Sequence, residues 1–205
     1  EKPSAVACCC RIDHNVSGLG GVCCSTIPVS NLLPAARGQP HAAVMTLMIV
    51  KNLTWPDESA TQEFASRLAA YWQQHPDSAD LLVLLHGDLG AGKTTLVRHL
   101  LRGLGVAGRI KSPTYALVEP YVTPCVQVWH FDFYRFADPQ EWEDAGLRDI
   151  FATPGLKLVE WPDKAGDLLP QPDWIIRLSS DVDEVRHLTL EALTPRGVTL
   201  MQEAT

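Results

Sequence analysis

The residues best suited to chemistry form a glycine-rich run in the middle of the chain. Gly87, Gly92, Lys93 and Thr94 occupy the four fixed positions of the pattern G-x-x-x-x-G-K-[ST]. Glycines in this pattern let backbone N–H groups approach phosphate oxygens, the lysine reaches the outer phosphates, and the hydroxyl can bind Mg²⁺. We therefore predict a nucleotide-phosphate site made of Gly87, Asp88, Leu89, Gly90, Ala91, Gly92, Lys93, Thr94 and Thr95.

The segments on either side of this run have the character that such a loop needs. Residues 81–86 are an apolar run of strand length, as expected for a strand buried on both faces of a sheet. After the loop, apolar residues recur at helical spacing up to Leu104, and Gly105 follows where a helix C-cap glycine belongs. Strand, glycine loop and helix in this order are the context of the P-loop.

Two acidic residues end further runs of strand length. Asp132 closes the run 126–132, and Glu160 lies near the end of the run 156–162. Because parallel strands deliver their carboxyl ends to one rim, we expect both acids near the glycine loop. Asp132 would approach Mg²⁺ directly or through water, and Glu160 would position an attacking water or add to the Mg²⁺ ligands. The predicted catalytic residues are Lys93, Asp132 and Glu160, and the predicted metal ligands are Thr94, Asp132 and Glu160.

Simpler interpretations of several of these residues stay open at this point. Asp132 can serve only as a turn or helix cap, and Trp161 can fill the core instead of stacking on a base. Arg135 is free either to orient Asp132 or to meet a partner. The loop Ser112, Pro113 and Thr114 is either a nucleotide-sensing switch or an ordinary turn.

The remaining pattern predicts one α/β domain over residues 45–205. It indicates a strand over 46–51, a helix that begins in a capping box at 59–62, and a helix after Asp138-Pro139. Tyr115, Leu117 and Tyr121 alternate as in a strand, and 174–178 and 186–192 read as an antiparallel edge. The predicted fold class is a P-loop NTPase-like mixed β-sheet, with a parallel core and antiparallel edge strands, flanked by helices.

Composition limits the classes of function. The 205 residues carry a formal net charge of −7, which argues against a broad nucleic-acid-binding surface. No apolar run approaches the roughly 18 residues that a membrane span needs, so we expect a soluble protein. Five of six cysteines crowd the first 24 residues without a zinc spacing, and a reducing cytoplasm is the expected compartment.

Residues 1–44 lack any sustained helical or strand period. We interpret them as a disordered or spurious extension, with Met45 as the true start. The bunched thiols also allow a metal- or redox-active tail.

Four motifs occur together in chain order, and as a set they resemble the bacterial TsaE (formerly YjeE) ATPases. The motifs are Gly87–Thr95, Lys111–Tyr115 with Leu117–Tyr121, His130–Arg135 and Leu158–Pro162. The resemblance implies an ATPase needed to make N6-threonylcarbamoyladenosine on the adenosine beside the anticodon of certain tRNAs. In that family the ATPase does not transfer the group itself. It binds a TsaB–TsaD assembly, which ATP hydrolysis is thought to reset.

The resemblance also assigns expected roles. ATP and Mg²⁺ are the expected cofactors and TsaB and TsaD the partners, with no sequence-specific nucleic-acid contact and no membrane. Trp161 would lie near the nucleotide, Ser112–Thr114 would be the switch loop, and Glu58 and Thr61 would border the nucleotide pocket.

Two rival functions share the P-loop. A small-molecule kinase would usually add an arginine-rich lid, and a GTPase switch protein would usually carry an N-K-x-D segment. The sequence has neither feature. We therefore favour a partner-dependent ATPase and keep the small-molecule kinase and the GTPase switch protein as alternatives.

Overall fold

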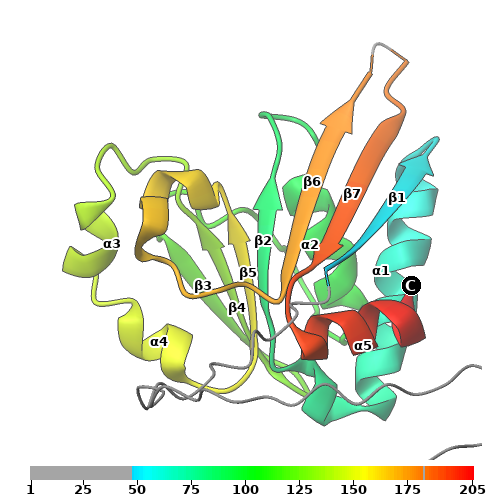
Figure 1. Ribbon diagram of the computed structural model, residues 1–205, viewed down its shortest axis with the longest axis horizontal. Coiled ribbons are helices and arrows are strands. Elements are labelled where there is room, and N and C mark those ends of the chain that lie inside the picture. The colour runs from blue at the N-terminus through cyan, green and yellow to red at the C-terminus, as the bar shows by residue number, and fades with distance from the viewer. Residues whose placement is uncertain (1–47, 182) are drawn as a thin grey trace, which may run out of the picture. The chain divides into compact units, whose positions relative to one another are not determined.

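The structure is a computed structural model that describes residues 48–181 and 183–205 (Figure 1). The interpretation of residues 1–44 as an extension falls outside the described residues, as do Thr46 and Leu47 of the first predicted strand.

A seven-stranded mixed sheet organises the chain, in the order β1-β7-β6-β2-β5-β4-β3 (Figure 1). Its strands are β1 Ile49–Trp55, β2 Leu82–His86, β3 Val118–Val122, β4 Gln127–Asp132, β5 Leu156–Glu160, β6 Trp174–Ser180 and β7 Arg186–Ala192. The four central strands β6, β2, β5 and β4 run parallel, while β3 at one edge and β7 and β1 at the other are antiparallel to their neighbours. The predicted mixed sheet with a parallel core is confirmed.

Helices cover both faces of the parallel core. Buried side chains of α1 Glu58–Gln74, α2 Lys93–Gly103 and α5 Pro195–Ala204 form one cluster with the sheet. The other face packs against α3 Gln140–Asp144, α4 Arg148–Ala152 and the 3₁₀ segment η2 Pro162–Leu168. A second 3₁₀ turn, η1 Pro76–Ala79, precedes β2. In β2, Val83 and Leu85 join the first cluster and Leu82 and Leu84 the second, which explains its unbroken apolar run.

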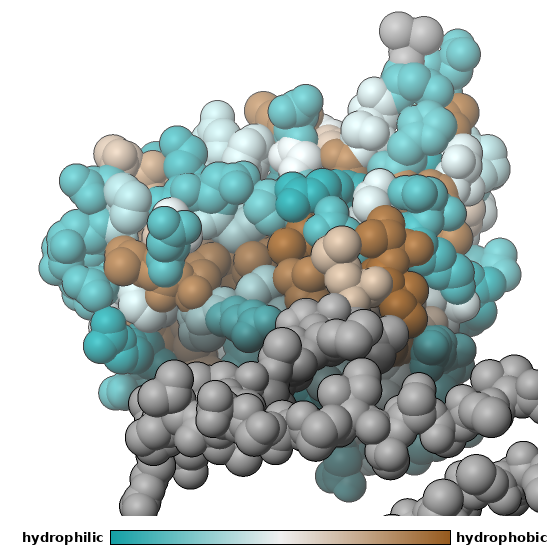
Figure 2. All heavy atoms as spheres, in the orientation of Figure 1, coloured by the Kyte–Doolittle hydropathy of each residue, from teal (hydrophilic) through white to brown (hydrophobic). Residues whose placement is uncertain are grey.

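The antiparallel end of the sheet has one covered and one open face. Leu53 and Trp55 of β1 pack inward, while Val50 is 47% exposed on the outer side. Arg177 and Glu191 pair across β6 and β7 at 3.0 Å. Figure 2 shows this outer face as mainly hydrophilic, with apolar side chains gathered over the beginnings of β1 and β6. The alternation of inward apolar and outward polar residues is typical of antiparallel strands.

Several predicted boundaries are wrong. The first strand is Ile49–Trp55 and not 46–51. α1 begins at Glu58, because Asp57 and not Ser59 is the N-cap: its backbone is extended, and its carboxylate accepts a 3.0 Å hydrogen bond from Ala60 N–H. The residue Tyr115 lies outside the strand predicted there, since β3 begins only at Val118.

The predicted antiparallel pairing of the last two strands is confirmed, whereas their predicted place at the edge of the sheet is wrong. β6 pairs in parallel with β2, and β7 lies inside the sheet because β1 covers it. The C-terminal helix α5 was not predicted, although Thr194-Pro195 is a good helix start: the Thr194 hydroxyl accepts a 3.1 Å hydrogen bond from Gly197 N–H. No helix among the described residues is both long and apolar enough to cross a membrane.

Candidate functional site

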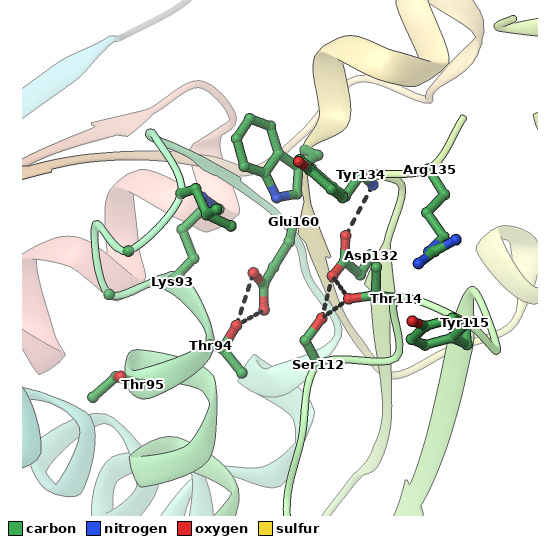
Figure 3. Close-up of a pocket in the computed structure, with 14 residues that line it drawn as sticks. Lys93, Thr94, Thr95, Ser112, Thr114, Tyr115, Asp132, Tyr134, Arg135 and Glu160 are labelled. Atoms are coloured by element: carbon green, nitrogen blue, oxygen red, sulfur yellow. Dashed lines mark hydrogen bonds between the residues drawn. The ribbon is translucent and has the colours of Figure 1, made fainter. Parts of the chain in front are cut away.

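The site lies at the rim where the parallel strands end. The glycine loop joins β2 to α2 there, and β4 and β5 end beside it with Asp132 and Glu160 (Figures 1 and 3). A pocket of about 380 Å³ opens between these segments. It is lined by Leu89, Gly90, Gly92, Lys93, Thr94, Thr95, Ser112, Thr114, Tyr115, Asp132, Tyr134, Arg135, Glu160 and Trp161.

The path of the loop requires glycine at both of its fixed glycine positions. Gly87 has φ 141°, and a Cβ there would lie 2.3 Å from the Leu178 carbonyl oxygen of β6. Gly92 has φ 105° and stands at the N-cap of α2, where no side chain caps the helix. The first N–H groups of α2 therefore face the loop without a side-chain partner. This end of a helix favours an anion.

Lys93 is nearly buried, with its ammonium against backbone and ring. Its Nζ donates hydrogen bonds to the carbonyl oxygens of Gly87 at 2.5 Å and Asp88 at 2.8 Å. It also lies 4.0 Å from the centre of the Trp161 ring. Burial lowers the pKa of Lys93, while the nearby carboxylates of Glu160, Asp132 and Asp88 oppose that shift. The ammonium therefore sits in a partly desolvated place beside the pocket.

Glu160 and Thr94 meet across the pocket floor, as Figure 3 shows. The Thr94 hydroxyl donates to both carboxylate oxygens of Glu160, at 2.8 and 3.0 Å. Glu160 is 2% exposed. The contact brings the helix that follows the glycine loop together with the end of β5.

Asp132 is held by the loop that precedes β3. Its Oδ2 accepts hydrogen bonds from the hydroxyls of Ser112 and Thr114, and its Oδ1 accepts one from Tyr134 N–H at 2.9 Å (Figure 3). Asp132 and Glu160 are register partners on adjacent parallel strands, so their side chains leave the same face of the sheet. The structure thus links the Ser-Pro-Thr loop directly to one of the two acids.

The structure decides between the open interpretations of Trp161 and Arg135. Trp161, at φ 57°, lines the pocket with Tyr134 at 5.1 Å between ring centres, so it does not fill the core. The guanidinium of Arg135 lies 4.0 Å over the ring of Tyr115. No hydrogen bond joins Arg135 to Asp132 in the described part of the chain, so Arg135 does not orient that carboxylate.

Some of the expected site residues lie outside the pocket lining. Gly87, Asp88, Ala91 and Pro113 belong to the two loops but do not line the pocket. Glu58 and Thr61 also lie outside it. The Glu58 carboxylate is 2.8 Å from His99 Nε2 of α2, and the buried Thr61 hydroxyl has no partner among the described residues. The structure does not bring these two α1 residues together with the acids.

Sequence reasoning also missed side chains that belong to the site. Tyr115 and Tyr134 line the pocket, and His130 lies behind Glu160 at 2.9 Å. Arg186, at the start of β7, approaches the loop: a Cβ on Gly92 would lie 3.1 Å from its Nε, and this buried Nε has no partner in the described ranges. The motif His130–Arg135 contained His130 and Tyr134, whereas no local signal marked Arg186.

The oxygen donors at the rim suit a small hard cation. Thr94, Glu160 and Asp132 offer one hydroxyl and two carboxylates, the donor types that Mg²⁺ prefers. Within residues 48–181 and 183–205, no cluster of three or more His, Cys, Asp or Glu side chains is arranged to hold a metal alone. Such a site fits a cation most of whose ligands are water molecules and phosphate oxygens.

Comparisons with known proteins agree with this architecture. The family model described as threonylcarbamoyl adenosine biosynthesis protein TsaE matches residues 55–188. The tRNA threonylcarbamoyladenosine biosynthesis protein TsaE of Haemophilus influenzae is 42% identical over 142 residues, which cover 69% of this chain and 89% of that protein. The protein of the same name from Bacillus subtilis is 35% identical over 158 residues, covering 75% of this chain and 94% of its own.

A solved structure is similar as well. The crystal structure of Bacillus subtilis YdiB superposes with a TM-score of 0.61 at 29% identity, and covers 76% of this chain and 95% of that chain.

Proposed function

This chain belongs to the TsaE family of threonylcarbamoyladenosine biosynthesis proteins, and we propose that it binds and hydrolyses ATP with Mg²⁺ to support N6-threonylcarbamoyladenosine synthesis on tRNA. One observation carries the ATPase proposal: Glu160 meets Thr94 at the first turn of α2, beside a glycine loop whose helix end has no side-chain cap. A hydroxyl and a carboxylate at the positive end of a helix suit a magnesium triphosphate.

The glycine loop and α2 would bind the phosphates. Backbone N–H groups of the loop and of the first turn of α2 would donate to phosphate oxygens. Lys93 would exchange its two backbone carbonyl partners, Gly87 and Asp88, for the outer phosphates. That exchange would return a partly desolvated ammonium to an anionic partner, which favours binding.

The two acids would serve the metal and the attacking water. Thr94 and Glu160 would hold Mg²⁺, with Asp132 beside them directly or through a water. When bound, Mg²⁺ would withdraw charge from the phosphoryl oxygens. A carboxylate at this rim would align the water for attack, and Lys93 and the loop amides would stabilise charge on the transferring phosphate.

Partner dependence is supported by what surrounds the pocket mouth. Leu89, Tyr115 and Tyr134 line the pocket and are 78%, 84% and 44% exposed. Large apolar and aromatic side chains that are exposed together mark a surface that contacts another protein. Among the described residues that line the pocket, the one arginine is Arg135, whose guanidinium lies over the ring of Tyr115. We infer that a TsaB–TsaD assembly docks at this mouth and accelerates hydrolysis, which would be slow in the isolated protein.

Two measurements test the proposal at separate levels. ATP affinity and turnover should both depend on Mg²⁺, and turnover should rise when the TsaB–TsaD assembly is added. Equal rates with and without the assembly would refute partner dependence. Appearance of a phosphorylated metabolite, in stoichiometric amount, would favour the small-molecule kinase instead.

The pathway assignment needs a test in cells. Deletion of the gene should remove threonylcarbamoyladenosine from tRNA, as measured by mass analysis of the nucleosides, and the intact gene should restore it. Unchanged nucleoside levels would remove the pathway assignment and leave the ATPase proposal standing.

A further inference from the structure

A buried histidine stands directly behind the acid that meets Thr94. His130 lies on β4 two residues before Asp132 and is 0% exposed. Its register partner on β5 is Leu158, so its side chain shares a sheet face with Glu160. His130 Nε2 is 2.9 Å from Glu160 Oε1.

The surroundings of the ring determine which nitrogen donates. An ionised carboxylate only accepts hydrogen bonds, so Nε2 carries the proton that Glu160 accepts. The other nitrogen, Nδ1, is buried and has no partner in the described part of the chain. A core residue of similar size without polar atoms would avoid leaving this nitrogen unpaired. The contact with Glu160 is the one polar interaction that the ring of His130 makes among the described residues.

Glu160 depends on this contact more than Asp132 depends on any single donor. Asp132 accepts from two hydroxyls and one backbone N–H. Glu160 accepts from only two side chains in residues 48–181 and 183–205, Thr94 in front and His130 behind. Thr94 is itself a proposed ligand of the cation, whereas His130 is not. His130 is therefore the donor that fixes the rotation of the Glu160 carboxylate independently of the cation.

We propose that His130 is a positioning residue: its Nε2–H holds the Glu160 carboxylate in the orientation that accepts Mg²⁺ beside Thr94. The role for the cation rests on the proposed function, whereas the hydrogen bond itself does not. Partners that orient metal-ligating carboxylates commonly change metal affinity by roughly 10- to 100-fold when removed.

The test compares variants that keep or lose a donor at the same point. His130→Gln places an amide N–H near the position of Nε2, His130→Asn places one nearer to Nδ1, and His130→Phe keeps the bulk without a donor. Val128→Ala is the matched control, since Val128 is a buried residue on the same face of β4 and has no polar group. Nucleotide affinity is measured by calorimetry over a series of Mg²⁺ concentrations and in EDTA, together with kcat, KM and the unfolding midpoint.

His130→Phe should need roughly 10- to 100-fold more Mg²⁺ for half-maximal nucleotide affinity, with affinity in EDTA unchanged. His130→Gln should stay close to the native protein, and His130→Asn should resemble His130→Phe. Val128→Ala should lower the unfolding midpoint without moving the Mg²⁺ requirement. If His130→Phe does not fold, the contrast between His130→Gln and His130→Asn still decides.

Two results would overturn the proposal. Equal Mg²⁺ requirements in all three His130 variants would show that the donor has no such role. A nitrogen NMR spectrum of the ligand-free protein in which Nδ1 carries the ring proton would contradict the hydrogen bond itself. Absence of any nucleotide binding by the native protein would instead refute the proposed function, and that result is distinguishable because the NMR measurement needs no ligand.

Discussion

The two ends of the parallel strands both bury charged groups, and they treat them in opposite ways. At the amino ends, acids face bases: Asp173 Oδ2 is 3.0 Å from the Arg196 guanidinium, and Asp80 lies 3.5 Å from Lys157 Nζ. At the carboxyl ends, Glu160 and Asp132 accept from hydroxyl groups, and Lys93 donates to backbone carbonyls. No lysine or arginine pairs with either of those two acids in the described ranges.

The two ends differ in whether their charged groups have oppositely charged partners within the protein. Two acids and two bases at the amino ends balance one another, so that end needs no further ion. The carboxyl ends leave Lys93 and two carboxylates with neutral partners around a pocket of about 380 Å³. Charged groups without a direct ion pair inside the protein are the ones with which a charged ligand can still pair. We therefore call the amino ends of these strands the structural end and, because we propose that a nucleotide binds there, their carboxyl ends the binding end.

The largest effect should follow from removing the lysine of the binding end. Lys93→Ala should lower kcat for ATP hydrolysis by about 100- to 1000-fold, because a charge that stabilises the transition state is lost. The unfolding midpoint should stay the same or rise, since burial lowers the pKa of Lys93 and its charged form is held at a cost. Steady-state kinetics and thermal unfolding check the two parts. Native turnover in this variant would contradict the assignment of Lys93 to the phosphates.

Removing an acid of the structural end should have the opposite profile. Asp173 is 2% exposed and accepts from Leu82 N–H, the Thr194 hydroxyl and Arg196. Asp173→Asn should cost about 2–3 kcal/mol of unfolding free energy, because an amide N–H would face these donors. Nucleotide affinity of the folded variant should not change.

The matched control for Asp173→Asn is an exposed ion pair. Glu63→Gln removes the partner of Arg67 on the surface of α1 and should change stability by less than about 0.5 kcal/mol. A loss for Asp173→Asn no larger than that of the control would mean that the network at the amino ends stabilises little.

Sequence patterns were sufficient to predict which residues meet at the binding end, because each of those residues belongs to a short local motif. An apolar run, the G-x-x-x-x-G-K-[ST] loop and an acid at a strand end each occupy a few neighbouring residues. The rule that parallel strands share a rim then brought Asp132 and Glu160 together with Thr94. Trp161 lies in the pocket wall, whereas its predicted closeness to a nucleotide stays a prediction.

Three features that sequence patterns did not predict are the direction of β6, the position of Arg186 and the cap of α1. The first two depend on contacts between distant segments. The direction of β6 relative to β2 follows from the crossover between them, and the alternation of residues 174–178 is the same in either direction. Arg186 reaches Gly92 only because the hairpin of β6 and β7 lies beside the loop. The placement of Asp57 as the cap of α1 depends on its extended backbone, which the pattern at 59–62 did not reveal.

A smaller effect is expected from the lysine of the structural end, in contrast with Lys93. Burial lowers the pKa of Lys157, and the nearby Asp80 opposes that shift. Lys157→Met keeps the length of the side chain and should change the unfolding free energy by less than about 1 kcal/mol in either direction, without altering nucleotide affinity. Chemical denaturation and calorimetry measure the two quantities.

The lowered pKa of Lys157 predicts how the free energy of unfolding changes with pH. Because the pKa of Lys157 lies below its unfolded value of about 10.4, the unfolded chain binds more protons between the two values, and stability rises with pH there. The rise should be smaller in Lys157→Met. An equal rise in both proteins would assign it to Lys93 instead.

A further small effect is expected for Asp80 in acid. Burial by itself would raise the pKa of Asp80, but the hydrogen bond from Gly155 N–H and the charges of Lys157 and Arg196 outweigh it and hold the pKa below its usual value. Its contribution to stability is therefore complete above the unfolded pKa of about 4 and is lost as pH falls through the folded pKa.

Asp80→Asn should accordingly be less stable than the native protein above about pH 5, by under about 1 kcal/mol because Asp80 is half-exposed. Denaturant unfolding at a series of acidic pH values should show the two proteins converging as pH falls. A difference that stays constant in acid would show that the geometry of the Gly155 hydrogen bond, and not the charge of Asp80, is what matters there. Charge balance would then no longer distinguish the amino ends of the strands from the rim that holds Lys93.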